Sequence, residues 1–241
     1  MSELDLRERV AEACRVLARL DLTRGATGHV SARVPGTDRV LIRARGPGEL
    51  GVRYTTAEQI VEVDRDGKLV GGASEGLAAP IEVFIHTAIY KARPEVNSVV
   101  HVHPATVVLF TICDVPLLPL FGAYDPSALQ LALEGIPTFD RSILVSTPEL
   151  GEELARTIGG AKTCMMRGHG ITTAAPSVEE AALYAIHLNE LATMNYQARL
   201  LGNPRPIPDE DLAAFRNLSR RSGGGGRAPA LWRYYCALTA D

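Results

Sequence analysis

Apolar residues along the chain follow two alternating spacings, one typical of helices and one typical of strands. From Leu6 to Leu20 they recur every three or four positions, which predicts an amphipathic helix. Short runs rich in β-branched residues predict strands, and Asp66-Gly67 has the composition of a hairpin turn. The predicted strands cover residues 39–42, 60–63, 68–70, 99–103, 143–145 and 163–166.

Helices are predicted between most of these strands. They cover residues 80–92, 127–134, a segment beginning near 148, and 177–202. Pro80 suits a first helical turn, and Ser177 followed three residues later by Glu180 is a capping-box pattern. Strands interleaved with helices predict an α/β fold, a three-layer α/β/α sandwich around one central sheet. The order in which the strands pair does not follow from this pattern.

One linker stands out, Ser222-Gly223-Gly224-Gly225-Gly226. Its composition predicts a flexible hinge, which divides the chain into a single domain, residues 1–222, and a tail, residues 223–241. The tail holds Trp232, the only tryptophan, and Tyr234. Such an aromatic tail either packs on its own domain or covers the site of a neighbouring subunit, and in the second case Tyr234 is a candidate substrate contact.

Composition and charge are those of an ordinary enzyme. With 241 residues, 46% of them hydrophobic, the chain is long enough to bury one large core. A net charge of −3 gives no reason to expect nucleic acid or an anionic membrane as a partner. The apolar runs are too short to span a bilayer, no secretory signal is visible, and the four cysteines are widely separated. We therefore expect a cytoplasmic enzyme with a small-molecule substrate.

Two histidines lie two positions apart in the strand predicted at residues 99–103. Side chains alternate between the two faces of a strand, so His101 and His103 point to the same side. Two neighbouring imidazoles make half of a divalent-metal site. The alternative is a pair of hydrogen-bonded histidines at the strand end.

A third histidine, His169, lies between Gly168 and Gly170, after another apolar run. The glycines allow backbone conformations that present a ligand at a strand-to-loop corner. Glu75, just before the helix predicted to begin at Pro80, is a candidate carboxylate. Three imidazoles and one carboxylate would complete a tetrahedral shell, and imidazole ligands suit zinc, manganese, iron and cobalt.

Three motifs, Ser74-Glu75, His101-Val102-His103-Pro104 and Gly168-His169-Gly170, occur in an order and at a spacing that resemble the class II aldolase/adducin-type family. The resemblance runs from about residue 5 to residue 202. It implies a mostly antiparallel central sheet with helices on both faces. It also implies that His101, His103 and His169 bind one divalent metal per subunit, and that Glu75 is a ligand in one state and an acid/base in another.

The resemblance further implies a homotetramer with sites at subunit boundaries, in which a tyrosine reaches the next subunit as a proton donor. Tyr124 is the nearest counterpart of that tyrosine. A phenol has an ordinary pKa of about 10, so it stays protonated at neutral pH. The alternative is that Tyr124 packs in the subunit interface without a role in catalysis.

The chain departs from the family's sugar-phosphate aldolases where those proteins bind phosphate. Those aldolases have Gly-Asn near the position of Gly28-His29, and Arg43 and Arg45 follow the next predicted strand. An arginine can hold a planar carboxylate with two hydrogen bonds. The alternative for either arginine is a solvated surface position. The candidate substrate contacts are His29, which is also a catalytic candidate, Ser31, Arg43, Arg45 and Ser74.

These departures favour the branch of the family that decarboxylates hydroxyaryl acids such as 3,4-dihydroxyphthalate. In that chemistry a metal stabilises the negative charge that develops on a phenolate oxygen, and an acid protonates the ring carbon. Two alternatives stay open. One is a class II (retro-)aldolase that acts on a hydroxy-keto acid or a sugar phosphate, and the other is a non-catalytic adducin-like binding module.

Overall fold

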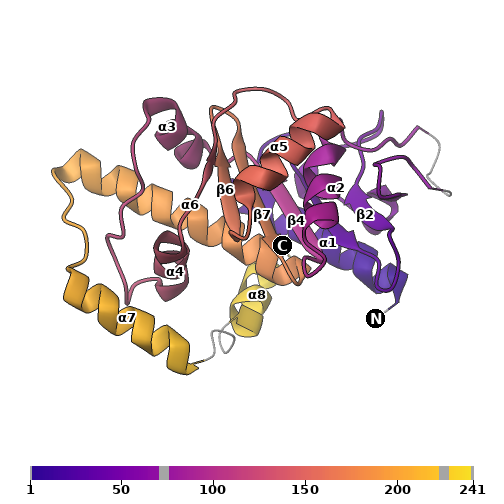
Figure 1. The fold of residues 1–241 in the computed structure, drawn as a ribbon. Coiled ribbons are helices and arrows are strands. Elements are labelled where there is room, and N and C mark those ends of the chain that lie inside the picture. Colours follow the sequence, from indigo (N-terminus) through magenta and orange to yellow (C-terminus); the bar gives the residue numbers. More distant parts are fainter. Residues whose placement is uncertain (1, 71–75, 223–227, 240–241) are drawn as a thin grey trace.

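A seven-stranded sheet forms the centre of the protein (Figure 1). The computed structural model describes residues 2–70, 76–222 and 228–239. The strands lie in the order β3-β2-β1-β4-β7-β6-β5, which places β4, the strand with His101, in the middle of the sheet. Their bounds are β1 (His29–Arg33), β2 (Val40–Arg43), β3 (Ile60–Val63), β4 (Ser98–Val102), β5 (Thr138–Phe139), β6 (Thr163–Met166) and β7 (Gly170–Ala175).

The direction of the strands corrects the expectation of a mostly antiparallel sheet. Antiparallel pairs join β1 to β2 and β4, β2 to β3, and β7 to β4 and β6. At one edge, β5 runs parallel to β6, so the sheet is mixed. A parallel pair needs a long crossover connection, and α5 (Pro148–Ile158) supplies it between β5 and β6. The α/β class itself is confirmed.

Helices cover both faces of the sheet. α1 (Glu3–Arg19) and α6 (Val178–Leu201) lie on one face, and α2 (Val83–Ala92) and α5 lie on the other (Figure 1). Each face carries its own cluster of buried apolar side chains, as a three-layer arrangement requires. The other helices are α3 (Ala105–Cys113), α4 (Pro126–Glu134), α7 (Asp209–Ser222) and α8 (Ala228–Ala237), with short 3-10 turns at Val52–Tyr54 and Ala57–Gln59.

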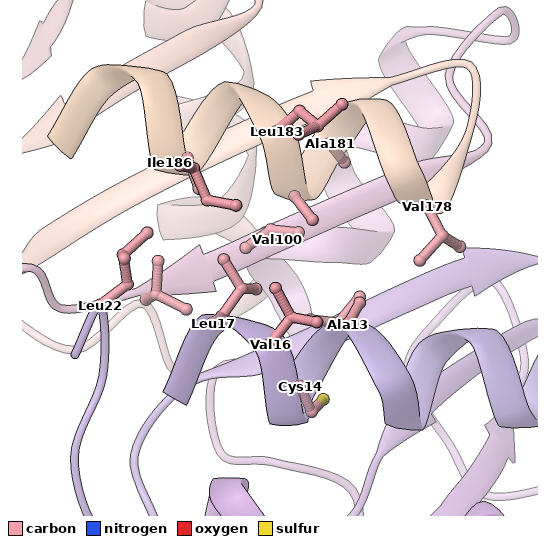
Figure 2. Close-up of a cluster of buried hydrophobic side chains, with 14 of the residues drawn as sticks. Ala13, Cys14, Val16, Leu17, Leu22, Val100, Val178, Ala181, Leu183 and Ile186 are labelled. Carbon is pink, nitrogen blue, oxygen red and sulfur yellow. The ribbon is translucent and has the colours of Figure 1, made fainter. Parts of the chain in front are cut away.

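The core between α1, α6 and the sheet follows from the helical spacing of the sequence. Leu17 of α1, Val100 of β4 and Ile186 of α6 converge there and are buried (Figure 2). Burying a side chain of this size contributes roughly 1.5–3 kcal/mol. At the start of α1, Ser2 Oγ accepts a hydrogen bond from the Asp5 N–H, and the Asp5 carboxylate accepts one from the Ser2 N–H. This capping box sets the point at which the helix begins.

The strand predicted at residues 143–145 is wrong. The chain is irregular there, and the short strand of this region, β5, comes before it. Leu144 is 55% exposed, and the N–H of Val145 donates to the Glu82 carboxylate instead of to a neighbouring strand. Residues 68–70 do turn back along β3 after Asp66-Gly67, as the hairpin signal predicts, but they form a single bridge, between Val63 and Leu69, rather than a regular strand. At residues 143–145 the partners of the backbone hydrogen bonds, rather than apolar composition, decide the structure.

The apolar run after the two histidines forms α3. Val107 and Phe110 point into the core between α1, α6 and the sheet, whereas Leu109 and Ile112 are 45% and 56% exposed. Among the helices that the structure describes, none combines the length and the apolar character of a membrane span.

The C-terminal tail packs on its own chain. α8 lies against α1 and α6, and Trp232 is only 8% exposed there. Arg19, at the end of α1, donates a hydrogen bond to the carbonyl oxygen of Leu238 (3.2 Å). Tyr234, on the same helix as Trp232, is 58% exposed. The sequence allowed the tail to pack on its own domain or to cover a neighbouring subunit, and in the structure it packs on its own domain.

We expect Trp232→Ala to lower the free energy of unfolding by about 3 kcal/mol, because truncating a buried aromatic side chain costs roughly 3–5 kcal/mol. Tyr234→Ala, in the same helix, should cost less than about 1 kcal/mol because its side chain faces solvent. Urea denaturation followed by far-ultraviolet circular dichroism measures both values. Equal losses in the two variants would contradict the packing of α8 on α1 and α6.

Candidate metal centre

β4 presents alternate side chains to the two faces of the sheet. Val100 and Val102 belong to the core under α1 and α6, whereas Val99 and His101 face α2. His103, just beyond the strand, lies on the same side as His101, and their Nε2 atoms are 3.0 Å apart. The prediction that these two imidazoles are neighbours on one face is confirmed.

His169 reaches the same place from the turn between β6 and β7. Gly168 has a φ of +58°, in the left-handed region that favours glycine. Gly170 passes so close to β4 that a Cβ atom there would lie 2.6 Å from the Cδ2 atom of His103. These two glycines allow the centroid of the His169 ring to lie 4.9 Å from that of His101.

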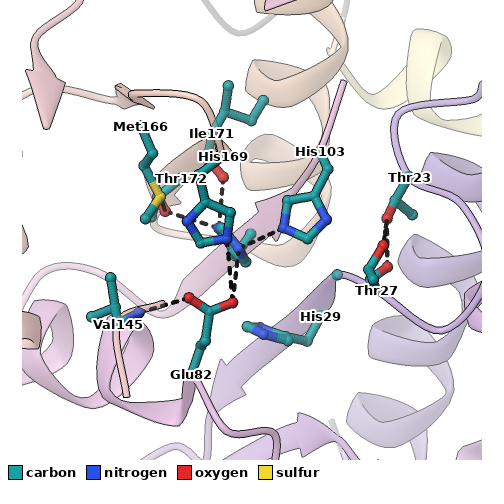
Figure 3. Close-up of polar contacts among 12 residues, drawn as sticks. Thr23, Thr27, His29, Glu82, His103, Val145, Met166, His169, Ile171 and Thr172 are labelled. Carbon is teal, nitrogen blue, oxygen red and sulfur yellow. Dashed lines mark hydrogen bonds and ion pairs between the residues drawn. The ribbon is translucent and has the colours of Figure 1, made fainter. Parts of the chain in front are cut away.

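The carboxylate that the structure brings to the three histidines is Glu82, at the N-terminal end of α2 (Figure 3). Its Oε2 atom lies 3.5 Å from Nε2 of His101 and 3.4 Å from Nε2 of His169. Its Oε1 atom accepts a hydrogen bond from the N–H of Val145 (2.8 Å). One oxygen of Glu82 is therefore held by the backbone, and the other faces the histidines.

Sequence reasoning did not identify Glu82 as a candidate ligand. A signal for it exists in the spacing of α2, where Glu82, His86 and Tyr90 follow one another at intervals of four positions. Residues four apart lie on one face of a helix, so these three polar side chains mark the face that meets the site. Glu75, the carboxylate that the sequence suggested, lies outside the described residues, as does Ser74.

The four side chains fit a divalent cation such as zinc. Nδ1 of His101 lies 3.0 Å from the carbonyl oxygen of Ile171, which can only accept, so Nδ1 carries the proton and Nε2 keeps its lone pair for a metal. The ligand atoms of Glu82, His101, His103 and His169 all lie within 4.8 Å of one another. In a tetrahedral zinc site with bonds of about 2.0–2.1 Å, ligand atoms are roughly 3.3 Å apart. Separations of 3.0, 3.4 and 3.5 Å among these side chains are close to that value.

The protonation states of Glu82, His101 and His103 are also those that a cation requires. Burial lowers the pKa of His101, and it lowers the pKa of His103 to about 3, so both rings are neutral. Burial by itself would raise the pKa of Glu82, but the imidazoles of His101 and His169 beside its Oε2 atom outweigh burial and hold the pKa of this carboxyl well below its usual range. Neutral imidazoles and an ionised carboxylate are the forms that bind metal.

A second group of polar side chains lies behind these ligands, between β1 and α2. His29 pairs with His101 in the sheet, and their ring centroids are 5.1 Å apart. Nδ1 of His29 lies 2.6 Å from Nε2 of His86, and Nδ1 of His86 lies 2.6 Å from Ser31 Oγ. Ser31 Oγ lies 2.7 Å from the hydroxyl of Tyr90. Ser31, a predicted substrate contact, is fully buried and is used inside this hydrogen-bonded chain.

The structure does not bring Arg43 to the ligands. Its guanidinium is buried, and it donates hydrogen bonds to backbone carbonyl oxygens, including that of Gly28 (3.4 Å). Arg43 therefore holds the turn that leads into His29. Arg45 is more exposed and donates to the carbonyl oxygen of Ala79 (3.0 Å), in the segment before α2.

The two tyrosines predicted as site residues lie on the surface of the protein. Tyr124 is 66% exposed and donates a hydrogen bond to Glu190 of α6 (2.8 Å). Tyr234 is 58% exposed on α8. The contacts that the structure shows for these two side chains do not join them to the ligand cluster.

Comparison with known proteins agrees with this geometry. Residues 8–196 match the family described as Class II Aldolase and Adducin N-terminal domain. The chain belongs to this family. The matched region contains all four side chains of the candidate metal centre.

Three relatives of this class II aldolase family member cover nearly its whole length. It is 38% identical to the 3,4-dihydroxyphthalate decarboxylase of Arthrobacter keyseri over 234 aligned residues, covering 96% of this chain and 92% of the relative. It is 36% identical to the protein of the same name from Rhodococcus jostii (strain RHA1) over 245 aligned residues, covering 100% of this chain and 99% of the relative. The solved structure of an L-fuculose 1-phosphate aldolase from Glaciozyma antarctica PI12 matches with a TM-score of 0.81 and 22% identity, covering 98% and 90% of the two chains, and shows the shared fold.

The buried histidine His86 predicts how the stability of this family member depends on pH. Burial lowers the pKa of His86 to about 3, below the value of about 6.5 in an unfolded chain. Between these values the unfolded state binds a proton that the folded state does not, so stability falls as the pH falls through this window. The slope for one such group is at most about 1.4 kcal/mol per pH unit.

We therefore expect His86→Gln to reduce the pH dependence of the free energy of unfolding of the metal-free protein between about pH 6.5 and pH 4. Urea denaturation at a series of pH values measures the slope. Tyr90→Phe is the matched control, because it removes a hydrogen bond from the same chain without removing a group that titrates in acid. An unchanged slope in His86→Gln would show that this ring is protonated in the folded state.

Proposed function

We propose that this protein is a metal-dependent carbon–carbon lyase that removes a carboxylate from a hydroxylated aromatic acid, with 3,4-dihydroxyphthalate as the substrate. The observation that carries the proposal is the convergence of Glu82, His101, His103 and His169 in a chain that is 38% and 36% identical to two proteins named 3,4-dihydroxyphthalate decarboxylase. In this proposal the cation is zinc, manganese, iron or cobalt, and the enzyme acts in the cytoplasm.

The reaction breaks the bond between a ring carbon and a carboxylate and releases carbon dioxide. The electron pair of that bond stays with the ring, and the ring carbon takes up one proton. A divalent cation in the site would supply a Lewis acid that stabilises negative charge on a neighbouring oxygen of the substrate. The chain contributes three imidazoles, which bind a metal in their neutral form, and one carboxylate, so a divalent cation would keep a net positive charge towards an anionic substrate.

His29 supports a carboxylate or phenol as the group that binds beside the ligands. Its ring lies next to that of His101, and its Nδ1 atom is bonded to His86. A phosphate cradle needs backbone N–H groups and hydroxyls that point to the ligand, and an imidazole at this position fills that place. Arg45 and Ser74 stay candidate contacts to the substrate, whereas the bonds of Arg43 assign it to the turn before His29.

The proton for the ring carbon needs a source other than Glu82 in its ionised form. The pKa of Glu82 lies well below its usual range, so this carboxyl has no proton to give at neutral pH. Glu75 and Tyr124 are the candidate donors in this proposal. The hydrogen bond to Glu190 raises the pKa of Tyr124, which keeps the phenol protonated. Because Tyr124 lies on the surface, it would serve the site of a neighbouring subunit.

A homotetramer with sites at subunit boundaries completes the proposal. Apolar side chains are exposed on α3 and in the segment between β5 and α5. Ile112 of α3 lies beside Gly168, and Leu109, Ile143 and Leu144 are 45%, 36% and 55% exposed. A cluster of exposed apolar side chains is typical of a surface that contacts another protein, and a second copy of the chain there would close the rim of the site.

We expect His103→Ala to lose both the bound metal and the activity, because it removes one of the four ligands. His187→Ala is the matched control: His187 is bonded to Asp125, away from the cluster, and its removal should leave the metal in place. Elemental analysis of the purified proteins measures the metal content. Stoichiometric metal in His103→Ala would refute the assignment of this cluster.

Glu82→Gln and Glu75→Gln separate the two candidate carboxylates. Glu82→Gln should weaken metal binding, because it removes the anionic ligand. Glu75→Gln should keep the metal and lower turnover by roughly 10²–10⁴-fold if Glu75 is the acid/base. Metal content and turnover, measured on both variants, assign the ligand and the acid/base separately. If only Glu75→Gln lost the metal, Glu75 would be the ligand and Glu82 the candidate acid/base.

A substrate panel tests the reaction. We expect the metal-loaded protein to release carbon dioxide from 3,4-dihydroxyphthalate and to cleave neither L-fuculose 1-phosphate nor ribulose phosphates. Carbon dioxide and aldehyde are assayed in parallel, with the His103→Ala protein as the blank. Aldehyde release from a sugar phosphate would instead identify an aldolase. A metal-loaded protein that converts no member of the panel would favour the binding module.

A further inference from the structure

The hydrogen-bonded chain Tyr90–Ser31–His86–His29 is not explained by metal binding alone. Tyr90, Ser31 and His86 are buried, at 4%, 0% and 0% exposure, beside the apolar side chains that α2 packs against the sheet. Buried polar groups are costly unless each one has a partner. The chain runs from the interior to His29, whose ring lies beside that of the ligand His101. The chain of hydrogen bonds therefore ends at His29, the residue of β1 that lies beside the metal ligands.

The donor and acceptor roles in this hydrogen-bonded chain can be assigned beginning at Tyr90. Burial raises the pKa of Tyr90, so its phenol keeps its proton. Among the described residues, the side-chain partner of this hydroxyl is Ser31 Oγ at 2.7 Å. Tyr90 is thus a donor to Ser31. Its ring is held by the guanidinium of Arg33, which lies 4.8 Å from the ring centroid and donates a hydrogen bond to the Tyr90 carbonyl oxygen (2.8 Å).

Ser31 in turn donates its hydroxyl proton to His86. The hydroxyl proton of Ser31 has two acceptors within reach, Nδ1 of His86 at 2.6 Å and the carbonyl oxygen of Val99 at 3.5 Å. The shorter contact is the stronger hydrogen bond, and a hydroxyl that already accepts a bond from Tyr90 is a better donor. Nδ1 of His86 is then an acceptor. A neutral imidazole carries one proton, so the proton of His86 lies on Nε2.

The same reasoning fixes the state of His29. Nε2–H of His86 donates to Nδ1 of His29, 2.6 Å away. A neutral His29 then carries its own proton on Nε2, the nitrogen that is not bonded to His86. We propose that His86, Ser31 and Tyr90 are positioning residues that hold His29 with its proton on Nε2, as a hydrogen-bond donor to an anionic oxygen of the substrate. The part that concerns the substrate rests on the proposed function, and the part that concerns His29 does not.

The position of the proton on His29 is measurable without substrate. Solid-state ¹⁵N NMR of protein labelled at histidine distinguishes a protonated from an unprotonated ring nitrogen, and the His29 signals are those that disappear in His29→Asn. We expect a protonated Nε2 and an unprotonated Nδ1 in both the metal-free and the zinc-loaded protein. A proton on Nδ1 of His29 in the wild-type protein would overturn the inference.

Two variants test whether the hydrogen-bonded chain determines which nitrogen of His29 carries the proton. Ser31→Ala removes the donor to His86 and should give a mixture of both His29 tautomers. Tyr90→Phe, which keeps the aromatic ring over Arg33, should shift the balance in the same direction and serves as a second route if Ser31→Ala does not fold. Ser98→Ala is the matched control, because Ser98 is equally buried in the same sheet but donates to the backbone oxygen of Ser31 (2.8 Å). Wild-type tautomers in both chain variants would overturn the inference.

Binding of 3,4-dihydroxybenzoate, the acid left when 3,4-dihydroxyphthalate loses the carboxylate that is ortho to a hydroxyl, tests the link to the substrate. Calorimetry on the zinc-loaded protein should show a dissociation constant raised roughly tenfold in Ser31→Ala, since a hydrogen bond to a charged group contributes about 1.5 kcal/mol or more. Ser98→Ala should bind as the wild type does. Equal binding by Ser31→Ala would overturn the role towards substrate. A wild-type protein that does not bind this acid would count against the proposed function and leave the NMR result standing.

Discussion

The ionised carboxylate of Glu82, which is 7% exposed between the sheet and α2, is the constraint on which the rest of the site depends. An unpaired charge in such a place costs several kcal/mol, and here the N–H of Val145 and the rings of His101 and His169 surround it. Satisfying this one group joins three segments that are distant in sequence: the start of α2, the end of β4 and the turn before β7. It also explains why the chain around Val145 does not enter the sheet.

α2 connects the candidate metal centre to the interior of the protein. One face of this helix carries Glu82, His86 and Tyr90, and that face meets the side chains of His29 and Ser31 on β1. A displacement of α2 would alter the ligand geometry and the hydrogen-bonded chain together. Substitutions in this layer share partners, so their effects on stability and binding should not be additive.

The fold alone does not choose between the reactions known among its relatives, because one fold commonly serves several chemistries. Retro-aldol cleavage and decarboxylation both break a carbon–carbon bond and leave an electron pair that a nearby positive charge stabilises. In our proposal the groups beside the ligands make the choice. His29 lies closest to them on the β1 side, and the hydrogen-bonded chain behind it determines which of its nitrogens can donate.

Local spacing was enough to predict the helices α1 and α6, the strand β4, and the shared face of His101 and His103, because helical and strand periodicity depend on neighbouring residues. The glycines on either side of His169 made it a third candidate ligand, and the resemblance of motifs supported that role. Glu82 as the carboxylate, the parallel edge strand β5 and the irregular backbone at Val145 came only with the tertiary structure. Each of them depends on a hydrogen bond or a contact between segments far apart in the chain. The spacing of Glu82, His86 and Tyr90 marks one face of α2, but it does not say which distant segments this face meets.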